Sequence, residues 1–420
     1  MIYQIGRRVF AFAIGQFCSE VRLAGAAPQE LGPLVVVPNH SNFLLDSLLI
    51  NFAYRREFWF LAKATLFQPQ PLAALLRACH LVPVQRRQDQ QGEQLKNDET
   101  FKFAIEKLSA GKGIVVFPEG VSLGERRLQP IKTGAARIAL QSEAAGEFNL
   151  GLMIQPVGIT YADLRQFRSS VTLTFGTPIR VAELQAAYQA DPLACVRELT
   201  ARIEDQIKRL TVEVASAEHE LLVEKIAKLY RSRGSTLDDR ERLALVARNV
   251  ELVARSKPEL AQEISSRLDE YGGMAAALGL DPAQRLEFVH DRLRLSLLAP
   301  LILIGCVTHV LPYRFVPVLV ARYASHPVAI ASVKLAAGMA VFAAWYLLLW
   351  CVFWAMGMEL TGALVLTAFI IFCGYITNNY YYLFRLHMLT ELWPGERSPV
   401  ELLRVVRDEL IAELEVLRVD

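Results

Sequence analysis

The chain has 420 residues, more than one compact domain usually holds, so two or three structural units are expected. Its 45 basic and 43 acidic residues nearly cancel, and this balance gives no indication of a nucleic-acid partner. Hydrophobic residues make up 53% of the sequence, above the roughly 45–50% of soluble domains, and the excess lies after residue 295. The composition therefore predicts a globular part followed by a membrane region.

Six cysteines are scattered along the sequence without the CxxC spacing of a metal or redox site. Three of them lie in apolar runs, where a cysteine behaves as a small hydrophobic residue. We therefore expect free thiols in a reducing compartment, with neither a disulfide framework nor a bound metal or other cofactor.

Residues 1–29 are predicted to form an interfacial helix on the membrane surface. Their apolar stretch, residues 9–14, is short for a secretory signal, and no small-residue cleavage site follows it. Arg7 and Arg8 lie inside an amphipathic pattern, which is typical of a helix at a membrane interface and also of one that caps a domain.

Residues 30–180 are expected to form an α/β domain with a mostly parallel sheet flanked by helices. Short β-branched runs are separated by segments of helical pattern, such as 100–110 and 133–143. The runs are apolar throughout rather than alternating, which indicates strands that are buried on both faces. The expected strands are 34–37, 58–61, 81–84, 114–117, 154–159 and 171–175.

Residues 181–294 have a charged, helical pattern, with interruptions expected at 231–236 and at Gly272-Gly273. The region carries no catalytic combination of residues. We therefore interpret it as a solvated helical insert or a surface for a partner.

Residues 295–390 are predicted to form a membrane region with two or three spans. The segments 335–358 and 360–384 carry no charge, and each exceeds the ~20 apolar residues that a span needs. Only Glu359 separates them, so they are expected to form a transmembrane hairpin that turns near this residue.

The flanks of this hairpin predict its orientation. Lys334 and Arg385 lie on one side of it, which favours that side as cytoplasmic. The uncharged run 295–313 is either a third span or a buried interfacial segment, and residues 391–420 are expected to form an amphipathic helix. The protein is thus expected in, or tightly attached to, the inner (cell) membrane, with its catalytic domain in the cytoplasm.

The first candidate site follows the expected strand 34–37 and reads Pro38-Asn39-His40-Ser41-Asn42, with Asp46 four residues later. A histidine and an aspartate suit general-base catalysis, because the carboxylate fixes the imidazole tautomer while the other ring nitrogen accepts a proton. Contact requires His40 in a loop and Asp46 on the helix that follows, with Ser41 or Asn42 as N-cap. A polar turn without catalytic function would suit the same residues.

Two further motifs also follow expected strands. Arg86 and Arg87 come after Val82-Pro83-Val84-Gln85, where a guanidinium pair suits a phosphate or an exposed strand end. Phe117-Pro118-Glu119-Gly120 closes the run 114–117; Glu119 can accept hydrogen bonds, and Gly120 allows close approach of the backbone to a ligand.

Positive charge follows the second of these motifs. Arg126, Arg127 and Lys132 concentrate charge that suits an anionic head group, and we count Arg126 and Lys132 as candidates for binding it. Gln155-Pro156-Val157 lies at the start of an expected strand. It is either part of a functional site or an ordinary piece of the sheet.

In this order, the motifs NHxxxxxD, VPVxR, FPEG and a strand with PV resemble the four blocks of the glycerolipid acyltransferase family. That family includes glycerol-3-phosphate and lysophosphatidic acid acyltransferases. The resemblance covers residues 34–179 and is specific as a set, although no single block is.

The resemblance implies transfer of a fatty acyl group from acyl-CoA or acyl carrier protein to a phosphorylated glycerol, glycerol-3-phosphate or 1-acylglycerol-3-phosphate, in phospholipid biosynthesis. His40 would be the general base and Asp46 its orienting partner. Membrane lipid would surround the enzyme, and neither a metal nor a covalent intermediate would be needed.

The resemblance also implies binding roles. Arg86 would hold the acceptor phosphate, Glu119 and Gly120 would help shape the acceptor site, and Pro156 would help form the acyl pocket. The sequence departs from the common pattern in two places. Five residues rather than four separate the histidine and aspartate, as in the branch with yeast-type dual glycerol-3-phosphate/dihydroxyacetone-phosphate acyltransferases. His80 stands where the family usually has glycine.

Two other functions fit parts of the sequence. Gly120-Val121-Ser122-Leu123-Gly124 matches the GxSxG motif of serine hydrolases, but Pro118-Glu119 precedes it and Pro130 follows, where a strand and a helix are needed. A non-catalytic lipid-binding membrane protein on the same scaffold would retain the motifs without turnover.

Overall fold

The computed structural model describes residues 2–26, 31–68, 70–85, 98–234, 237–283, 285–286, 292–324, 326–391, 393–395 and 397–417. Internal contacts divide the chain into two units. The first comprises residues 1–213 together with Pro327–Ser332, and the second comprises residues 214–326 and 333–420.

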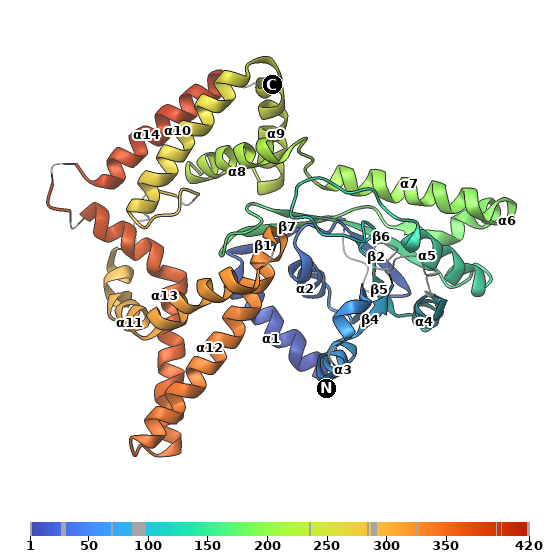
Figure 1. The fold of residues 1–420 in the computed structure, drawn as a ribbon, viewed down its shortest axis with the longest axis horizontal. Coiled ribbons are helices and arrows are strands. Elements are labelled where there is room, and N and C mark those ends of the chain that lie inside the picture. Colours follow the sequence, from blue (N-terminus) through green and yellow to red (C-terminus); the bar gives the residue numbers. More distant parts are fainter. Residues whose placement is uncertain are drawn as a thin grey trace. The chain divides into compact units, whose positions relative to one another are not determined.

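The first unit is built on one eight-stranded sheet with the spatial order β1-β7-β6-β2-β5-β3-β4, in which β8 pairs with β6 (Figure 1). β6 is antiparallel to β7 and β8, and all other pairs are parallel. The expected α/β class with a mostly parallel sheet is therefore confirmed. The strands are β1 (Glu20–Gly25), β2 (Leu34–Pro38), β3 (Phe58–Lys63), β4 (Leu81–Val84), β5 (Gly113–Val115), β6 (Met153–Tyr161), β7 (Ser170–Phe175) and β8 (Ile179–Arg180).

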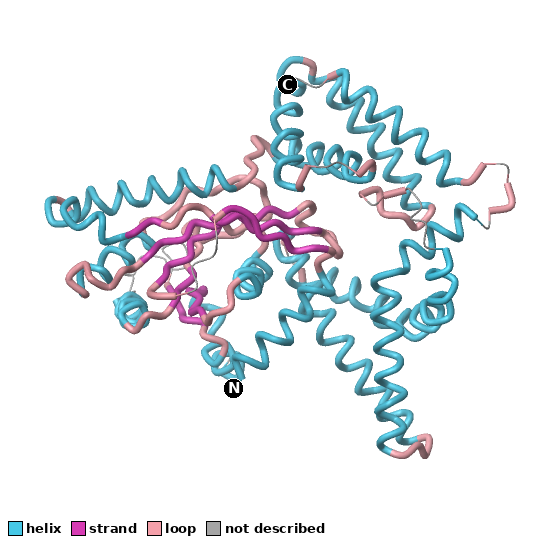
Figure 2. Tube along the Cα trace, turned by 180° about the vertical axis from the view of Figure 1, so that it is seen from behind, coloured by secondary structure: helices cyan, strands magenta, loops and turns pink. Residues whose placement is uncertain are grey.

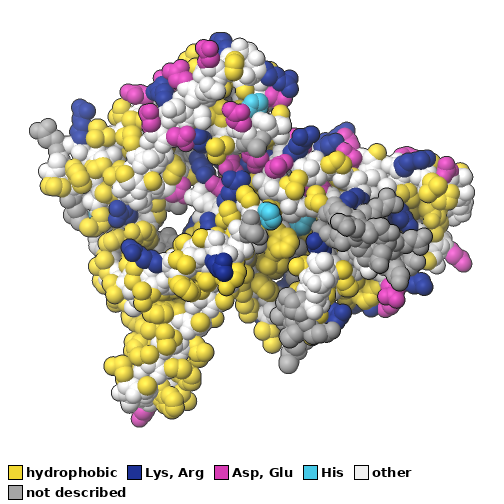
Figure 3. All heavy atoms as spheres, in the orientation of Figure 1, with side chains coloured by type: hydrophobic (Ala, Val, Ile, Leu, Met, Phe, Trp, Pro, Cys, Tyr) yellow, Lys and Arg dark blue, Asp and Glu magenta, His cyan; other side chains and the backbone are white. Residues whose placement is uncertain are grey.

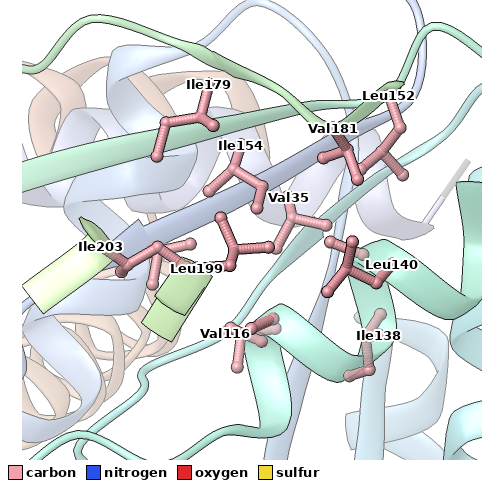
Figure 4. Packing of buried hydrophobic residues seen from close by; sticks show 14 of the residues in the cluster. Val35, Val116, Ile138, Leu140, Leu152, Ile154, Ile179, Val181, Leu199 and Ile203 are labelled. Carbon is pink, nitrogen blue, oxygen red and sulfur yellow. The ribbon is translucent and has the colours of Figure 1, made fainter. Parts of the chain in front are cut away.

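Helices lie on both faces of this sheet, as Figure 2 shows. They are α1 (Ile2–Phe17), α2 (Phe43–Ala53), α3 (Gln70–Ala78), α4 (Asp98–Ser109), α5 (Gly134–Ala145), α6 (Gln185–Ala190) and α7 (Pro192–Leu210). Alternate residues of β2, such as Val35 and Val37, pack with Ile154 of β6 against α4, α5 and α7 in one buried cluster (Figure 4). Burial of the central strands on both faces explains their continuous apolar sequence.

The second unit consists of helices in the part that the structure describes. These are α8 (Ala217–Ser232), α9 (Asp239–Ser256), α10 (Pro258–Ala277), α11 (Arg292–Tyr323), most of α12 (Ile330–Ala355), α13 (Leu360–Glu391) and α14 (Pro399–Val416). The expected interruption at Gly272-Gly273 is wrong, because both glycines lie inside α10. The burial of Leu268, Tyr271 and Ala275 beside them offsets the ~1 kcal/mol that each glycine costs in a helix.

Within the described residues, three segments are long and apolar enough to cross a membrane, by length and composition: Leu293–Tyr323, Pro327–Ala355 and Leu360–Glu391. α12 and α13 turn between Ala355 and Leu360, where the sequence predicted the hairpin, and hydrophobic side chains cover its visible face (Figure 3). Residues 295–313, for which the sequence left open a third span or a buried interfacial segment, lie inside the long helix α11. These helices indicate that the protein associates with a membrane.

Candidate active site

The loop after β2 and the first turn of α2 bring His40 and Asp46 together. His40 Nδ1 lies 2.9 Å from Asp46 Oδ2. The Asp46 side chain is fully buried, and that of His40 is 11% exposed. Because a carboxylate can only accept, the hydrogen-bond pattern assigns the proton to Nδ1 and leaves a lone pair on Nε2. Nε2 makes no hydrogen bond with any residue that the structure describes.

Two more donors hold the Asp46 carboxylate. The backbone N–H of Asn42 donates to Oδ2 at 2.7 Å, and the hydroxyl of Tyr161, on β6, donates to Oδ1 at 2.5 Å. Burial, followed by the charge of Asp46, raises the pKa of Tyr161 well above its ordinary value, so this hydroxyl remains a donor. Three donors compensate the cost of burying the carboxylate and fix its orientation.

Glu119 joins the histidine loop to the loop that follows β5. Its Oε1 accepts the backbone N–H of His40 at 2.6 Å, and its Oε2 accepts that of Gln129 at 2.8 Å. The His40 ring stacks on Phe117, with 4.0 Å between ring centroids. Burial raises the pKa of Glu119 to about 7, although the hydrogen bonds from Gln129 and His40 oppose this shift. Glu119 therefore holds the backbone of His40 rather than pointing at open solvent.

Gly120 follows in a turn that requires glycine. Its φ is +66°, in the left-handed region, and a Cβ atom there would lie 2.7 Å from Lys132 Nζ. The backbone N–H of Lys132 donates to Pro118 O at 2.8 Å. The structure thus brings the exposed Lys132 beside the motif that contains Glu119.

Arg126 is placed differently from the exposed cation that the sequence suggests. Its side chain is buried, and one guanidinium nitrogen donates to the carbonyls of Tyr161 and Ala162 at 2.8 and 3.0 Å. These contacts anchor the loop to the end of β6. Arg127, the next residue, is exposed.

Pro156 lies inside β6, opposite Val37 of β2. On its other side β6 pairs with β8 through Ile154 and with β7 from Val157 onward. Proline, which has no N–H, falls in the gap between these two ladders. Its carbonyl still accepts the N–H of Gly176 at 2.9 Å. A structural reason therefore accounts for this proline.

Two other sequence candidates need separate comment. Arg86 and Arg87 lie outside the described residues, and β4 ends just before them at Val84. Ser122 accepts the backbone N–H of Phe43 at 3.0 Å, and no α-helix begins between it and Gly134. The strand–turn–helix arrangement of a hydrolase nucleophile is thus absent around Ser122, within a segment that is described throughout.

Residues 20–160, which carry His40, Asp46 and Glu119, match the family model named Acyltransferase. This match and the two yeast relatives described next confirm the resemblance of the sequence to glycerolipid acyltransferases.

Glycerol-3-phosphate O-acyltransferase 2 of Saccharomyces cerevisiae is 29% identical over 140 residues, which are 33% of this chain and 19% of that relative. Glycerol-3-phosphate O-acyltransferase 1 of the same yeast is 31% identical over 135 residues, 31% of this chain and 18% of the relative. The match thus spans about a fifth of the length of these curated relatives. The crystal structure of the 1-acyl-sn-glycerophosphate acyltransferase PlsC from Thermotoga maritima aligns with 50% of this chain and 76% of its own, at 22% identity and a TM-score of 0.34.

Proposed function

We propose that this protein transfers a fatty acyl group from a thioester to the hydroxyl of a phosphorylated glycerol, with His40 as general base. The observation that carries the proposal is the His40–Asp46 pair inside an acyltransferase-family domain. Nδ1–H faces a buried carboxylate, and Nε2 keeps the lone pair that a base needs.

The reaction needs only direct attack. His40 Nε2 removes the proton from the acceptor hydroxyl, and the oxygen forms a bond with the thioester carbonyl carbon. The C–S bond breaks as the tetrahedral intermediate collapses, and the imidazolium returns its proton to the thiolate. Asp46 stabilises the imidazolium between these steps. General-base catalysis of this kind contributes ~10²–10⁴-fold, and positioning of the two substrates supplies much of the rest.

The residues around the pair support binding of an anionic acceptor. Gly120 and the exposed Lys132 lie beside the loop that Glu119 ties to His40. We propose that Lys132 attracts the acceptor phosphate, and that Arg86 binds it as the sequence motif implies. Since the two yeast relatives are named for glycerol-3-phosphate, we propose this acceptor before 1-acylglycerol-3-phosphate.

The experiment that tests this function is thioester consumption by the purified full chain in detergent. Acyl-CoA and acyl carrier protein thioesters are supplied in turn with glycerol-3-phosphate, dihydroxyacetone phosphate and 1-acylglycerol-3-phosphate. His40→Ala is compared with the matched control His219→Ala, which changes a histidine of α8 in the second unit. We expect turnover with at least one acceptor, lost in His40→Ala and kept in His219→Ala.

Other outcomes have clear meanings. Turnover that survives in His40→Ala would remove this residue as the base. No turnover with any donor and acceptor would favour the non-catalytic lipid-binding alternative, and equilibrium binding of the same lipids would then test it.

We also propose that the first unit faces the cytoplasm. Lys334 and Arg385 flank the α12–α13 hairpin on one side, and Pro327–Ser332, just before Lys334, belongs to the first unit. Single cysteines in place of Lys334 and Glu359, in a chain without its native cysteines, test this orientation. A membrane-impermeant maleimide should label position 359 from outside intact cells and position 334 only after lysis. The reverse pattern would overturn the orientation without affecting the proposed reaction.

A further inference from the structure

The N-terminus of α2 lacks its ordinary local cap. Asn42 occupies the N-cap position, but its side chain makes no capping bond and instead donates to Leu164 O at 2.7 Å. A helix leaves its first N–H groups without partners in the helix itself, so these donors need acceptors from elsewhere.

Serines from two distant segments supply these acceptors. Ser122 Oγ accepts the N–H of Phe43 at 3.0 Å, and Ser332 Oγ accepts the N–H of Leu45 at 3.2 Å. The Ser332 hydroxyl also donates to the carbonyl of Asn42 at 3.1 Å. Its side chain is buried, so these two bonds are shielded from competing water.

Ser332 belongs to Pro327–Ser332, the short segment whose contacts place it in the first unit. Val328 of this segment lies so close to Gly124 that a Cβ there would be 3.2 Å from the Val328 Cα. The segment therefore touches both the start of α2 and the loop after Glu119. It is also the beginning of the candidate membrane span Pro327–Ala355.

Asn42 links Ser332 to the catalytic pair. Its carbonyl accepts from Ser332, while its own N–H donates to Asp46 Oδ2 at 2.7 Å, the oxygen that also contacts His40. A change in the position of the Asn42 backbone would therefore move the Asp46 carboxylate and, through it, the imidazole.

We propose that Ser332 is a positioning residue: from the start of a membrane helix it holds Asn42 and the first turn of α2, and thereby sets the orientation of Asp46 toward His40. The inference rests on the proposed acyl transfer and adds to it a residue far from all four sequence motifs. It makes the entry of α12 a part of the active-site scaffold.

Removing the hydroxyl should affect catalysis more than folding. Leu45 N–H also donates to Asn42 O at 3.1 Å, so α2 keeps a bond in its first turn when Ser332 becomes alanine. The Asn42 carbonyl, in contrast, loses its link to the segment. Because Ser332 acts on Asp46 through the Asn42 backbone, we expect kcat to fall while KM stays unchanged.

The test compares Ser332→Ala with Ser142→Ala in the full chain. Ser142 is an equally buried serine whose hydroxyl donates to Ile138 O within α5, remote from the pair in its bonding. For Ser332→Ala we expect a three- to about tenfold lower kcat, corresponding to the loss of its buried hydrogen bond to the Asn42 carbonyl, with KM within about twofold. Amide exchange measured by mass spectrometry should become faster in the peptide that begins at Asn42.

Neither change is expected in Ser142→Ala. Unchanged kcat in Ser332→Ala would overturn the proposal, even if exchange becomes faster. Lower kcat with unchanged exchange and a raised KM would also overturn it, because the effect would then act on substrate binding. If the wild-type chain shows no turnover, the acyltransfer proposal fails. Amide exchange still decides, without turnover, whether Ser332 holds the first turn of α2.

Discussion

The hydroxyl of Tyr161 donates to the carboxylate of Asp46 at 2.5 Å, although 115 positions separate the two residues. The aspartate that orients the proposed base is therefore held by the last residue of β6, a strand that is far from it in the sequence. Both groups are buried, so the bond is a charge-assisted contact in a poorly solvated environment.

Tyr161→Phe is expected to lower kcat roughly tenfold and the free energy of unfolding by about 1.5–3 kcal/mol. The phenyl ring keeps the packing, but one oxygen of a buried carboxylate loses its donor. Thioester assays and thermal unfolding measure the two effects. Tyr188→Phe, at a partly buried position of the mostly exposed α6, is the control and should change neither. Wild-type kcat in Tyr161→Phe would show that Asn42 and His40 suffice to hold Asp46.

The sequence was sufficient to predict the candidate site residues that come directly after a strand. His40, Asp46 and Glu119 each follow a buried strand, and the parallel sheet brings the ends of these strands to one edge. A loop histidine and a helical aspartate could therefore be predicted from spacing and strand position.

The partners of these residues could not be predicted in the same way. Tyr161 ends β6 in an apolar run, and Ser332 lies in a segment that reads as the flank of a membrane helix. Their roles depend on contacts between distant segments, which no local pattern encodes. The burial of Arg126 could not be predicted for a related reason, since charge alone does not tell whether a guanidinium contacts solvent or backbone carbonyls.

Two strands were also not predicted from the sequence. β1 is a mostly exposed edge strand, so its residues do not form an apolar run, and β8 has only two residues. At Gly272-Gly273 the sequence predicted an interruption where the helix continues, because packing around α10 outweighs the low helix propensity of glycine.

Glu119 is expected to make stability depend on pH. Its pKa is about 7 in the folded chain and 4.5 in an ordinary environment, so the folded state binds the proton more tightly. The stabilisation from this group is complete below pH 4.5 and is lost as the pH rises through 7. The slope approaches about 1.4 kcal/mol per pH unit inside this window.

Glu119→Gln, which cannot titrate, isolates this contribution. Thermal unfolding of both proteins from pH 5 to 8 should show the wild type losing stability relative to the variant, by up to about 3 kcal/mol. A stability difference that does not change with pH would mean that Glu119 remains ionised throughout, held by the N–H groups of His40 and Gln129.

Gly120→Ala is expected to lower the free energy of unfolding by about 1–2 kcal/mol, because L residues are strained at a φ of +66°. The added Cβ would also displace the Lys132 ammonium, so KM for the phosphorylated acceptor should rise. Gly134→Ala is the matched control. Gly134 begins α5 with an ordinary φ and open space at its Cβ position, so alanine there should be neutral or stabilising. Equal stability of the two variants would contradict the strain argument.

His80 occupies the position where glycine is usual in the family, and its backbone explains that preference. Its φ is +63°, and its ring is stacked between Tyr3 and Trp59, with centroid separations of 4.3 and 4.4 Å. A left-handed conformation costs a non-glycine residue about 1–2 kcal/mol, whereas each stacked pair contributes about 0.5–1.5 kcal/mol. The stacking thus offsets the strain of the histidine backbone.

Substitution of His80 separates these two effects. His80→Ala loses the stacking and keeps the strain, whereas His80→Gly loses the stacking and relieves the strain. We therefore expect the glycine variant to be about 1 kcal/mol more stable than the alanine variant, and the wild type to be at least as stable as either. Urea or thermal unfolding of the three proteins measures this order. An alanine variant as stable as the glycine variant would show that the backbone at position 80 relaxes out of the left-handed region once the ring is removed.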